Sequence, residues 1–527
     1  MRGPPLLVLT ALALACNPAP SSPENSTSTE TTASETAATA VTGMPTTTGT
    51  ATDGGTLPDT DGATSTGTAA ESPPVVECPV AFTSTVSDID GDGHNDAYIS
   101  NQEQLAELAG CTDMSGSLYL NSGVTDLTPL VSLRHIVRKL DISGSSYTTE
   151  PKGLLSLAGL EALESVGGLV IKSVSVTDLA PLTGLTSIPG DVQITGLLRL
   201  ESLEGLHNLE HIGGELNVGG GKQLLDLNGL RNLQQVGTHI FLSQLEITNL
   251  HGLEALTEVG APGGEPSSIR LYGLHQLTSL DALAIDWHDA HALWIYQSAI
   301  SDLGILAGVD ALNSLELLDN KLLIDLAGLD SLVVVHDALT LDGNDNLIDI
   351  NALASLQSVG ALTLNDSPLT DLGPLPALQQ VGDVRVAQNE QLIALSALGG
   401  FTSVGSLVLE DNPALAVVPD LAGLTQIDGN LEIRRNDALI SITDLSAVTK
   451  VGGRLVVVVN PELPEADAET WAAPINVGGD RKIAGNKQDP APPASPCPWV
   501  EDGECDEDAN GLGICAPNTD EQDCIFG

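Results

Sequence analysis

The 527-residue sequence predicts a mainly β fold in which about 15 short coils stack into a solenoid. Short triplets with an apolar residue at the first and third positions recur through the chain, and each is the smallest unit of a period-two strand. Most triplets start 22 to 24 residues apart, with two intervals of 29. One strand per coil at a fixed spacing is typical of stacked repeats. The triplets begin at Leu118, Leu140, Leu169, Val192, Leu216, Ile240, Ile269, Leu293, Leu315, Leu339, Leu362, Val384, Leu407, Leu431 and Leu455.

One unit shows how a coil is expected to form. In the triplet Leu407-Val408-Leu409, the two leucines point into the coil and Val408 points outward. A second apolar run follows and closes the coil, and Gly429 stands before the next strand. We expect glycine there because it adopts backbone angles closed to other residues.

Asparagine recurs three residues after the triplet in the second half of the chain, with Ser367 as the one interruption. A stacked Asn can use its amide to satisfy turn backbone groups that no neighbouring strand reaches. Earlier coils carry Ser145, Val174, Gly221 or Leu245 there, so we expect the N-terminal half to be less regular. The series is Asn320, Asn344, Asn389, Asn412, Asn436 and Asn460.

The repeat resembles the leucine-rich repeats of the receptor L-domain type over about residues 97–465. The resemblance rests on units such as Asn389-Glu390-Gln391-Leu392 followed by Leu395, Leu398, Val404 and Gly405. It implies a right-handed solenoid, here over residues 118–488. It implies little about a ligand, because such solenoids bind very different partners.

Residues 78–117 precede the first triplet and resemble the N-terminal cap of L-domains. Asn101 is a suitable helix N-cap and Gly110 a suitable stop, which predicts a short helix between them. The resemblance implies that Cys78 bridges to Cys111 and closes the first coil.

The N-terminus carries the pattern of a secretion signal: Met1-Arg2, an apolar run up to Ala15, and then Cys16. A Cys in that place resembles a bacterial lipoprotein signal, which implies cleavage after residue 15 and a lipid on Cys16. The alternative is an ordinary signal with an incidental Cys. Residues 16–77 are rich in Thr, Ser, Ala, Pro and acids and contain no Lys, Arg or aromatic residue, which predicts a disordered stalk. The stalk resembles those of myxobacterial lipoproteins, and it is either glycosylated or a bare spacer.

Seven Cys residues are present, and a lipid on Cys16 leaves an even set, as expected for disulfides in an exported chain. Four of these lie in residues 489–527, an acidic C-terminal module with a Pro-rich start. The module loosely resembles Notch-type cysteine repeats but has four Cys where that family has six. We expect two disulfides there, with or without calcium. The set is Cys78, Cys111, Cys497, Cys505, Cys515 and Cys524.

An Asp-rich loop precedes the first coil and predicts a structural calcium site. Hard carboxylate oxygens at alternating positions, a Gly at the sixth position and a carbonyl at the seventh suit Ca²⁺. Ile99 replaces the Glu that an EF-hand has at position 12, so the loop better resembles the calcium loops of integrin-like propeller repeats. The alternative is an acidic turn that holds no ion. The expected ligands are Asp88, Asp90, Asp92, His94 and Asp96.

The formal charge of −51 argues against nucleic acid as a partner. The sequence shows no Gly-x-Ser-x-Gly elbow, no His-Glu-x-x-His and no phosphate loop, so we expect no enzyme. His288 and His291 stand close to Asp286 and Asp289, which suggests either a metal or, more simply, a polar loop. Pairs of acids that mimic a polysaccharide-cleaving β-helix carry little weight in a chain with 70 acidic residues.

Aromatic residues are rare, 13 in the chain, and five fall between residues 241 and 296. The triplet rule places four of them, with one arginine, on the outward side of three consecutive coils. Exposed aromatic rings beside an arginine are typical of binding hot spots. The alternative interpretation is that Trp287 and some of the other aromatic residues fill space in the longer coils. The predicted binding residues are Phe241, Arg270, Tyr272, Trp294 and Tyr296.

The sequence therefore predicts a lipid-anchored protein on the surface of the outer membrane that binds an extracellular protein or glycan through the solenoid sheet. The alternatives are a polysaccharide-cleaving β-helix enzyme and a passive structural component of the surface.

Overall fold

The computed structural model describes residues 76, 86–87, 96–145, 153–260, 266–287, 291–373, 375–396, 400–418, 421 and 423–487. All of them belong to one unit of the chain, Pro73–Gly527. No helix among these residues is long and apolar enough to cross a membrane.

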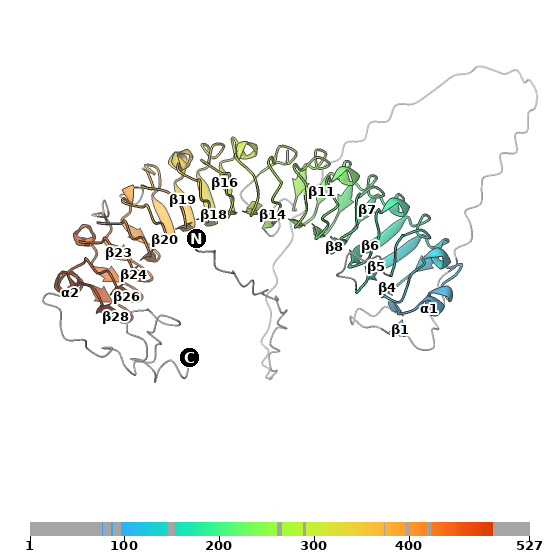
Figure 1. The fold of residues 1–527 in the computed structure, drawn as a ribbon, viewed down its shortest axis with the longest axis horizontal. Coiled ribbons are helices and arrows are strands. Elements are labelled where there is room, and N and C mark those ends of the chain that lie inside the picture. Colours follow the sequence, from blue (N-terminus) through green and yellow to red (C-terminus); the bar gives the residue numbers. More distant parts are fainter. Residues whose placement is uncertain are drawn as a thin grey trace, which may run out of the picture. The chain divides into compact units, whose positions relative to one another are not determined.

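All 15 triplets form strands, and each strand pairs in parallel with the next one along the chain. The pairing keeps triplets in register, so Leu216 lies beside Ile240 and Asn217 beside Phe241. The predicted β-solenoid is therefore confirmed. Figure 1 shows these strands on the inner side of the curved solenoid and the turns on its outer side. The strands are β4 (Leu118–Leu120), β5 (His135–Ser143), β6 (Ser165–Lys172), β8 (Val192–Thr195), β10 (Leu216–Gly219), β12 (His239–Ser243), β14 (Ser267–Tyr272), β15 (His291–Tyr296), β17 (Ser314–Leu318), β18 (Val334–Asp342), β19 (Ser358–Asn365), β20 (Gln380–Ala387), β22 (Leu407–Glu410), β24 (Leu431–Arg434) and β26 (Leu455–Val458).

The sheet continues beyond the triplets at both ends. On the N-terminal side, β2 (Asp96–Ile99) pairs in parallel with β4 and antiparallel with β1 (Val86–Ser87), while β3 (Asp113–Met114) pairs with β5. On the C-terminal side, β28 (Arg481–Ala484) pairs with β26. Strand β16 (Ala311–Leu312) pairs with β18.

Shorter elements form the remaining sides of the coils. Two four-stranded sheets and short turns of 3-10 helix lie along the second apolar run of many units. The small sheets contain β7 (Ser187–Ile188), β9 (His211–Ile212), β11 (Gln235–Val236) and β13 (Glu258–Val259), then β21 (Ser403–Val404), β23 (Gln426–Ile427), β25 (Lys450–Val451) and β27 (Asn476–Val477). The 3-10 turns are η1 (Thr128–Leu130), η2 (Ala180–Leu182), η3 (Asn228–Leu230), η4 (Gly304–Leu306), η5 (Asn351–Ser355) and η7 (Thr443–Leu445).

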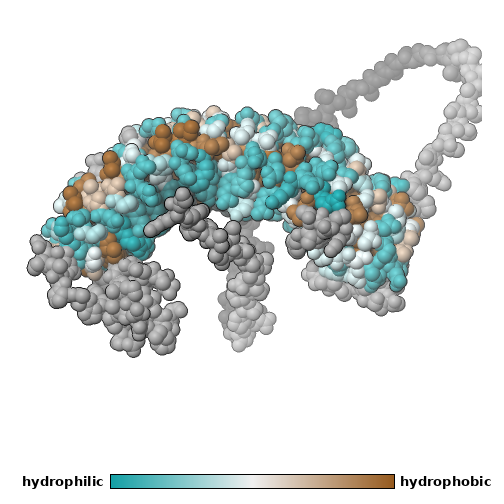
Figure 2. All heavy atoms as spheres, in the orientation of Figure 1, coloured by the Kyte–Doolittle hydropathy of each residue, from teal (hydrophilic) through white to brown (hydrophobic). Residues whose placement is uncertain are grey.

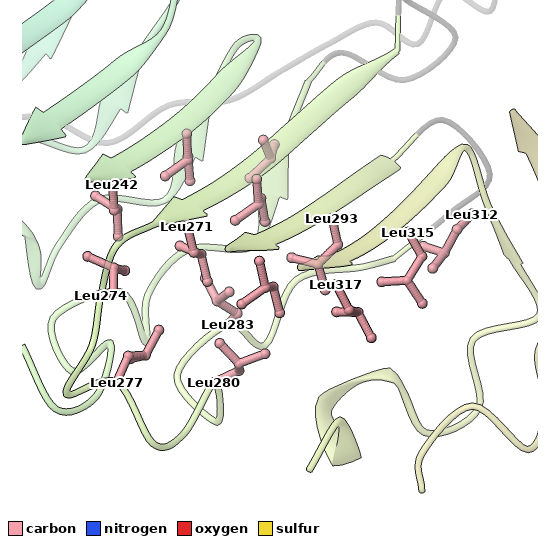
Figure 3. Packing of buried hydrophobic residues seen from close by; sticks show 14 of the residues in the cluster. Leu242, Leu271, Leu274, Leu277, Leu280, Leu283, Leu293, Leu312, Leu315 and Leu317 are labelled. Carbon is pink, nitrogen blue, oxygen red and sulfur yellow. The ribbon is translucent and has the colours of Figure 1, made fainter. Parts of the chain in front are cut away.

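The core is a continuous column of aliphatic side chains. The first and third triplet residues are buried, and leucines of the turns meet them from the opposite side. Figure 3 shows this for Leu271 and Leu293 from the strands and Leu274 and Leu277 from a turn. The surface drawn in Figure 2 is mostly hydrophilic, with small hydrophobic groups along the coils. Since no coil has a core of its own, stability depends on stacking between neighbours.

The asparagines form the expected ladder. The amide N–H of Asn412 donates to Asn436 Oδ1 at 3.1 Å, and Asn436 Nδ2 donates to the Leu409 carbonyl at 3.0 Å. The ladder extends one step beyond the sequence-based series, to Asn486, whose N–H donates to Glu465 Oε2 at 3.1 Å. Glu465 begins helix α2 (Glu465–Ala472), which is part of the last coil, between β26 and β28. The carboxylate of Glu465 ends the ladder, because it accepts the last hydrogen bond and has no hydrogen to donate to a further coil.

The residue before each ladder position has left-handed backbone angles. Asp411, Arg435 and Val459 have φ of 53°, 54° and 56°, and glycine stands at this position in other coils, as at Gly343 and Gly485. Left-handed angles turn the chain out of the strand, and they are costly for a β-branched residue such as Val459.

The expected reason for glycine before the strands is wrong. Gly429 does not have positive φ. A Cβ there would lie 2.3 Å from Ser406 Oγ and 3.1 Å from the Gly405 carbonyl oxygen of the preceding coil. Glycine is favoured here because adjacent coils approach closely at this corner, and the backbone angle is not the cause.

The helix expected after Asn101 is α1 (Gln102–Ala106), and Asn101 Oδ1 accepts a hydrogen bond from the Gln104 N–H at 3.0 Å. Gly110, with φ of 87°, ends the turns that follow helix α1. Leu105 and Leu108 are fully buried and join the core column. The segment thereby covers the first coil.

Candidate binding surface

The five predicted binding residues lie together on the outward face of the main sheet. Phe241 of β12 is the register partner of Arg270 of β14, which in turn is the partner of Trp294 of β15. Tyr272 and Tyr296 are register partners one pleat further along β14 and β15. We call Phe241, Arg270, Tyr272, Trp294 and Tyr296 the aromatic strip.

A cation–π contact joins two members of the strip. Arg270 Cζ lies 4.1 Å from the centroid of the Trp294 ring. The guanidinium is also held by a hydrogen bond, because Arg270 Nε donates to Ser268 Oγ at 2.9 Å. Arg270 therefore forms a fixed positive group over an aromatic face, a contact worth about 0.5–2 kcal/mol.

His239 extends this chain of contacts. Its Nδ1 lies 3.1 Å from the Ser268 N–H, which donates to it, and 2.9 Å from Ser268 Oγ. Burial lowers the pKa of His239, and the neighbouring Arg270 lowers it further against a smaller opposing effect of Glu215. A neutral ring fits its role as acceptor from a backbone N–H.

The two tyrosines form the other half of the strip. Their rings meet edge to face, with centroids 6.0 Å apart and planes at 84°. The Tyr296 hydroxyl donates to a carboxylate oxygen of Glu316 on β17. Burial raises the pKa of Tyr296, as does this hydrogen bond, so Tyr296 remains a neutral donor. Tyr272 is 41% exposed and presents the most accessible ring of the strip.

Trp294 leaves one polar group unused. Its Nε1 is buried and has no hydrogen-bond partner. The strip thus combines an exposed tyrosine ring with a fixed guanidinium over an indole ring. Aromatic and arginine side chains held in place by their neighbours lose little entropy on binding, which is the physical basis of a hot spot.

Trp287 does not belong to the strip. It packs against the core, and its ring lies 5.6 Å from the ring of His291 at 72°. His291 is buried, with Nε2 2.8 Å from the Val259 carbonyl oxygen. His288 and Asp289 lie outside the described residues, and no group of three His, Cys, Asp or Glu side chains suited to a metal occurs within the described ones. These contacts favour the space-filling interpretation of Trp287.

Of the predicted calcium ligands, Asp88, Asp90, Asp92 and His94 lie outside the described residues. Asp96 starts β2 and is fully buried. Its Oδ1 accepts from the Ser117 N–H at 2.7 Å, while Oδ2 is buried without a hydrogen-bond partner. A buried carboxylate oxygen with no partner is costly unless it meets a cation or a donor. Asp96 therefore fits the role of an inner ligand at the end of the Asp-rich loop.

The lipidation and disulfide residues are almost all outside the described part of the chain, namely Cys16, Cys78, Cys497, Cys505, Cys515 and Cys524. Cys111 is described and is buried at the end of the α1 segment, where its N–H donates to the Leu108 carbonyl at 3.1 Å.

Sequence reasoning missed the side chains that hold the strip in place. Neither Ser268 nor Glu316 is aromatic. Ser268 lies on the same strand as its partner Arg270, two residues earlier, whereas Glu316 lies on the strand next to that of its partner Tyr296. Aligning the triplets in register would have placed Glu316 beside Trp294. Another missed cluster lies on β20 to β24, where the buried carboxylate of Glu410 lies 2.8 Å from Arg385 and 3.3 Å from Arg434 Nη2.

Comparisons with known proteins show no family for this chain. No protein-family model matches the chain, and no curated protein matches it. Among solved structures, an internalin from Listeria monocytogenes is 18% identical, with 69% of this chain and 84% of that chain covered and a TM-score of 0.36. A leucine-rich-repeat protein of Leptospira interrogans is 13% identical, with 72% and 92% covered and a TM-score of 0.35. Similarity at this level says nothing about a ligand.

Proposed function

We propose that the protein is a recognition protein that binds an extracellular protein or glycan through the aromatic strip. The observation that supports this most is the fixed Arg270 over Trp294, next to the exposed ring of Tyr272. Many outward positions of the sheet carry small or polar residues, such as Gln193, Asn217 and Thr340, and large rings on this face give little benefit to folding. Their benefit is realised when a partner covers them.

The chemistry of the carboxylates supports binding over cleavage of a glycan. A glycosidase needs one carboxyl group whose pKa is raised. On the described sheet face, Glu316 accepts from Tyr296, and Glu410 is paired with arginines. Two described acids on the turns shift the other way. A hydrogen bond from Arg231 lowers the pKa of Glu204. Burial raises the pKa of Glu254, but backbone hydrogen bonds and His251 together bring it below its ordinary value.

We also propose that Cys16 carries a lipid and holds the protein at the outer surface of the cell, with residues 16–77 as a spacer. The support is the signal pattern and the Thr- and Ser-rich composition that follows it. Cys16→Ala should then move the protein from the membrane fraction to the soluble fraction. A variant that stays in the membrane fraction contradicts the anchor.

A structural calcium ion at the Asp-rich loop completes the proposal. Its ligands are Asp88, Asp90, Asp92 and Asp96 with the His94 carbonyl, and its support is the unpartnered Oδ2 of Asp96. The ion would neutralise a buried charge beside the first strands of the sheet.

The strip is tested with protein and glycan arrays probed with the full chain, followed by affinity measurements on the ligand found. Trp294→Ala should weaken binding by about 2 kcal/mol, roughly 30-fold in Kd. It should cost little stability, about 1 kcal/mol for the lost cation–π contact. Thr340→Ala is the matched control, since Thr340 occupies the same outward position on β18.

Unchanged affinity in Trp294→Ala would exclude the strip as the binding surface. A loss of about 3–5 kcal/mol of stability, as for a core Trp, would show that the ring serves the fold.

A further inference from the structure

The outward face of the sheet is buried at the C-terminal end of the solenoid. Strands β24, β26 and β28 are its last three (Figure 1). Val456 and Val458 are outward residues of β26 and are fully buried. Their register partners on β28 are Lys482 and Ala484, which are 5% and 8% exposed. Outward side chains of a sheet face open to water keep part of their surface exposed, so this burial requires a covering layer.

Strand β28 has the reverse burial of the strands before it. Its core-facing residues are Arg481, which is exposed, and Ile483, which is half-buried. This is expected for a terminal strand that has a coil on one side only. Its outward residues, Lys482 and Ala484, are the buried ones. The cover therefore lies on the outward side of the sheet.

A comparison of two lysines excludes the sheet itself as the cover. Lys172 holds an outward position on β6, with β5 and β8 paired on either side, and it is exposed. Within the described residues, Lys482 has a neighbouring strand on one side only, β26. A lysine with fewer neighbours should be the more exposed of the two, and yet Lys482 is buried.

The two valines are separate from the core column. Val456 and Val458 form an apolar cluster of their own, and among the described apolar residues only the adjacent Val459 packs against them. Burying two valines on a sheet face is favourable only when apolar groups replace the water that would otherwise cover them. The cover therefore brings apolar side chains from outside the described coils.

The charges of this face are nearly balanced in a strongly acidic chain. Arg454 and Asp480 each stand two residues before an outward residue, Val456 and Lys482 respectively. They adjoin a network of three carboxylates and three arginines. With Lys482 the face has one positive charge in excess, so an acidic segment approaches it without net repulsion. The network consists of Glu410, Asp411, Glu432, Arg385, Arg434 and Arg435.

The segment that follows β28 has the composition of a suitable cover. The described residues end at Lys487, three residues after β28, and residues 489–527 are the acidic Cys-rich module. The module has ten acidic residues and no Lys or Arg, and its large apolar residues include Trp499 and Phe526. Residues 16–77, the other long segment outside the coils, contain no aromatic residue.

The module can reach this face. Its Pro-rich start, residues 489–498, spans about 30 Å at roughly 3.1 Å per residue. Three strands spaced about 4.8 Å apart are only about 10 Å wide. A short tether also gives an effective concentration on the order of millimolar, so a weak contact is enough to keep the module in place.

We propose that residues 489–527 fold back over the outward face of β24, β26 and β28. Apolar side chains of the module lie on Val456 and Val458, and one of its carboxylates meets the ammonium of Lys482, since a buried ammonium needs a counter-charge close by. The module thereby closes the last strands to other ligands. Strands β17 to β22 separate this face from the aromatic strip, which stays open.

The first test measures the acylation rate of single lysines in the full chain with an N-hydroxysuccinimide ester, followed by mass spectrometry. Lys482 should react at least about tenfold more slowly than Lys172, as for a cover that is open less than about a tenth of the time. Val456→Asn should bring the rate of Lys482 close to that of Lys172, because a polar group replaces an apolar contact. Thr340→Asn, at the same outward position on β18, is the matched control and should leave the Lys482 rate unchanged.

Amide hydrogen exchange in β26 shows whether the strand itself stays folded in Val456→Asn, and it should match the wild type. Acylation of Lys482 as fast as that of Lys172 in the wild type overturns the covered face. Unchanged protection of Lys482 in Val456→Asn overturns the valines as the contact, as does an equal effect of Thr340→Asn.

The second test identifies the cover in the wild-type chain. A carbodiimide joins an ammonium to a carboxylate in contact with it, and Lys482 should be joined to an acid of residues 489–527 within the same chain. A link to residues 16–77, a link between two chains, or a link only to Glu432 or Asp480 overturns the assignment to the C-terminal module.

Discussion

Replacing Ser367 with asparagine should stabilise the solenoid by completing the ladder. In complete steps the side-chain Oδ1 accepts from the N–H of the preceding ladder residue, and Nδ2 donates to the third triplet residue of the preceding strand. At this step the Ser367 hydroxyl instead accepts from the Leu369 N–H at 3.3 Å. An asparagine side chain in its place would accept from the Asn344 N–H and donate to the carbonyl of Leu341.

The magnitude follows from two new hydrogen bonds. The hydrogen bond from the Leu369 N–H to the Ser367 hydroxyl is lost in exchange. At about 0.5–1.5 kcal/mol for each bond, less the cost of ordering a longer side chain, Ser367→Asn should gain about 1 kcal/mol. The reverse change, Asn412→Ser, leaves the Asn389 N–H and the Val386 carbonyl, which Asn412 now satisfies at 3.1 and 3.0 Å, without partners. Two buried unsatisfied groups cost about 2–6 kcal/mol.

Two assays measure the effect. Urea unfolding reports the whole solenoid, and hydrogen exchange of the Asn344 amide reports the step itself, because coils of a repeat protein can open separately. Ser367→Asn should raise the urea midpoint and slow exchange at Asn344. A midpoint that stays or falls, together with unchanged exchange, would refute the account of the ladder as the source of turn stability.

Three further outcomes are expected. Calcium at 100-fold above its Kd should stabilise the fold by about 2.7 kcal/mol. Chelation should therefore lower the melting temperature, and Asp90→Ala should remove the difference. Identical melting of the wild type with and without chelator would exclude the site. Because burial lowers the folded-state pKa of His239, the unfolded chain binds more protons just below pH 6.5. Wild-type stability should therefore fall relative to His239→Gln as pH decreases from about 7.5 to about 5.5. This window is set around the ordinary histidine pKa. Parallel stability profiles of the two proteins across it would contradict the prediction. Val459→Asn should gain about 1 kcal/mol by relieving the left-handed strain at φ of 56°, measured by thermal melting against Val459→Ile, which keeps the strain.

The period-two triplets made the fold predictable, because the first and third residues of each strand face one shared core. The same rule failed at β28, where Arg481 stands opposite the inward-facing Leu455 and bonds to the Ile475 carbonyl. A terminal strand has a coil on one side only, so its inward positions need not be aliphatic. The expected irregularity of the N-terminal half is wrong for the sheet, since β4 to β12 pair in continuous register apart from a bulge in β5.

The aromatic strip was predictable for a related reason, since the middle triplet residue always faces outward. Its supporting contacts depend on register between coils, and intervals that vary between 22 and 29 residues conceal that register in the sequence. Tyr98 was not grouped with Tyr119, whose ring stacks on it, for the same reason, although β2 pairs with β4 residue for residue. The bulge in β5 has no local signal, because an extra residue changes spacing without changing composition.

The asparagine ladder has a consequence for how the gene can change in length. Each step from Asn389 to Asn460 uses the same pair of hydrogen bonds to the preceding coil, so one coil is interchangeable with the next. Duplicating or deleting a whole coil between them preserves every bond of the ladder and leaves the closing carboxylate of Glu465 at the end. Around residues 241–318, by contrast, the side chains on successive strands are matched to one another, and an inserted coil would separate Arg270 from Trp294. Natural copies of the chain should therefore differ in repeat number on the C-terminal side of the strip.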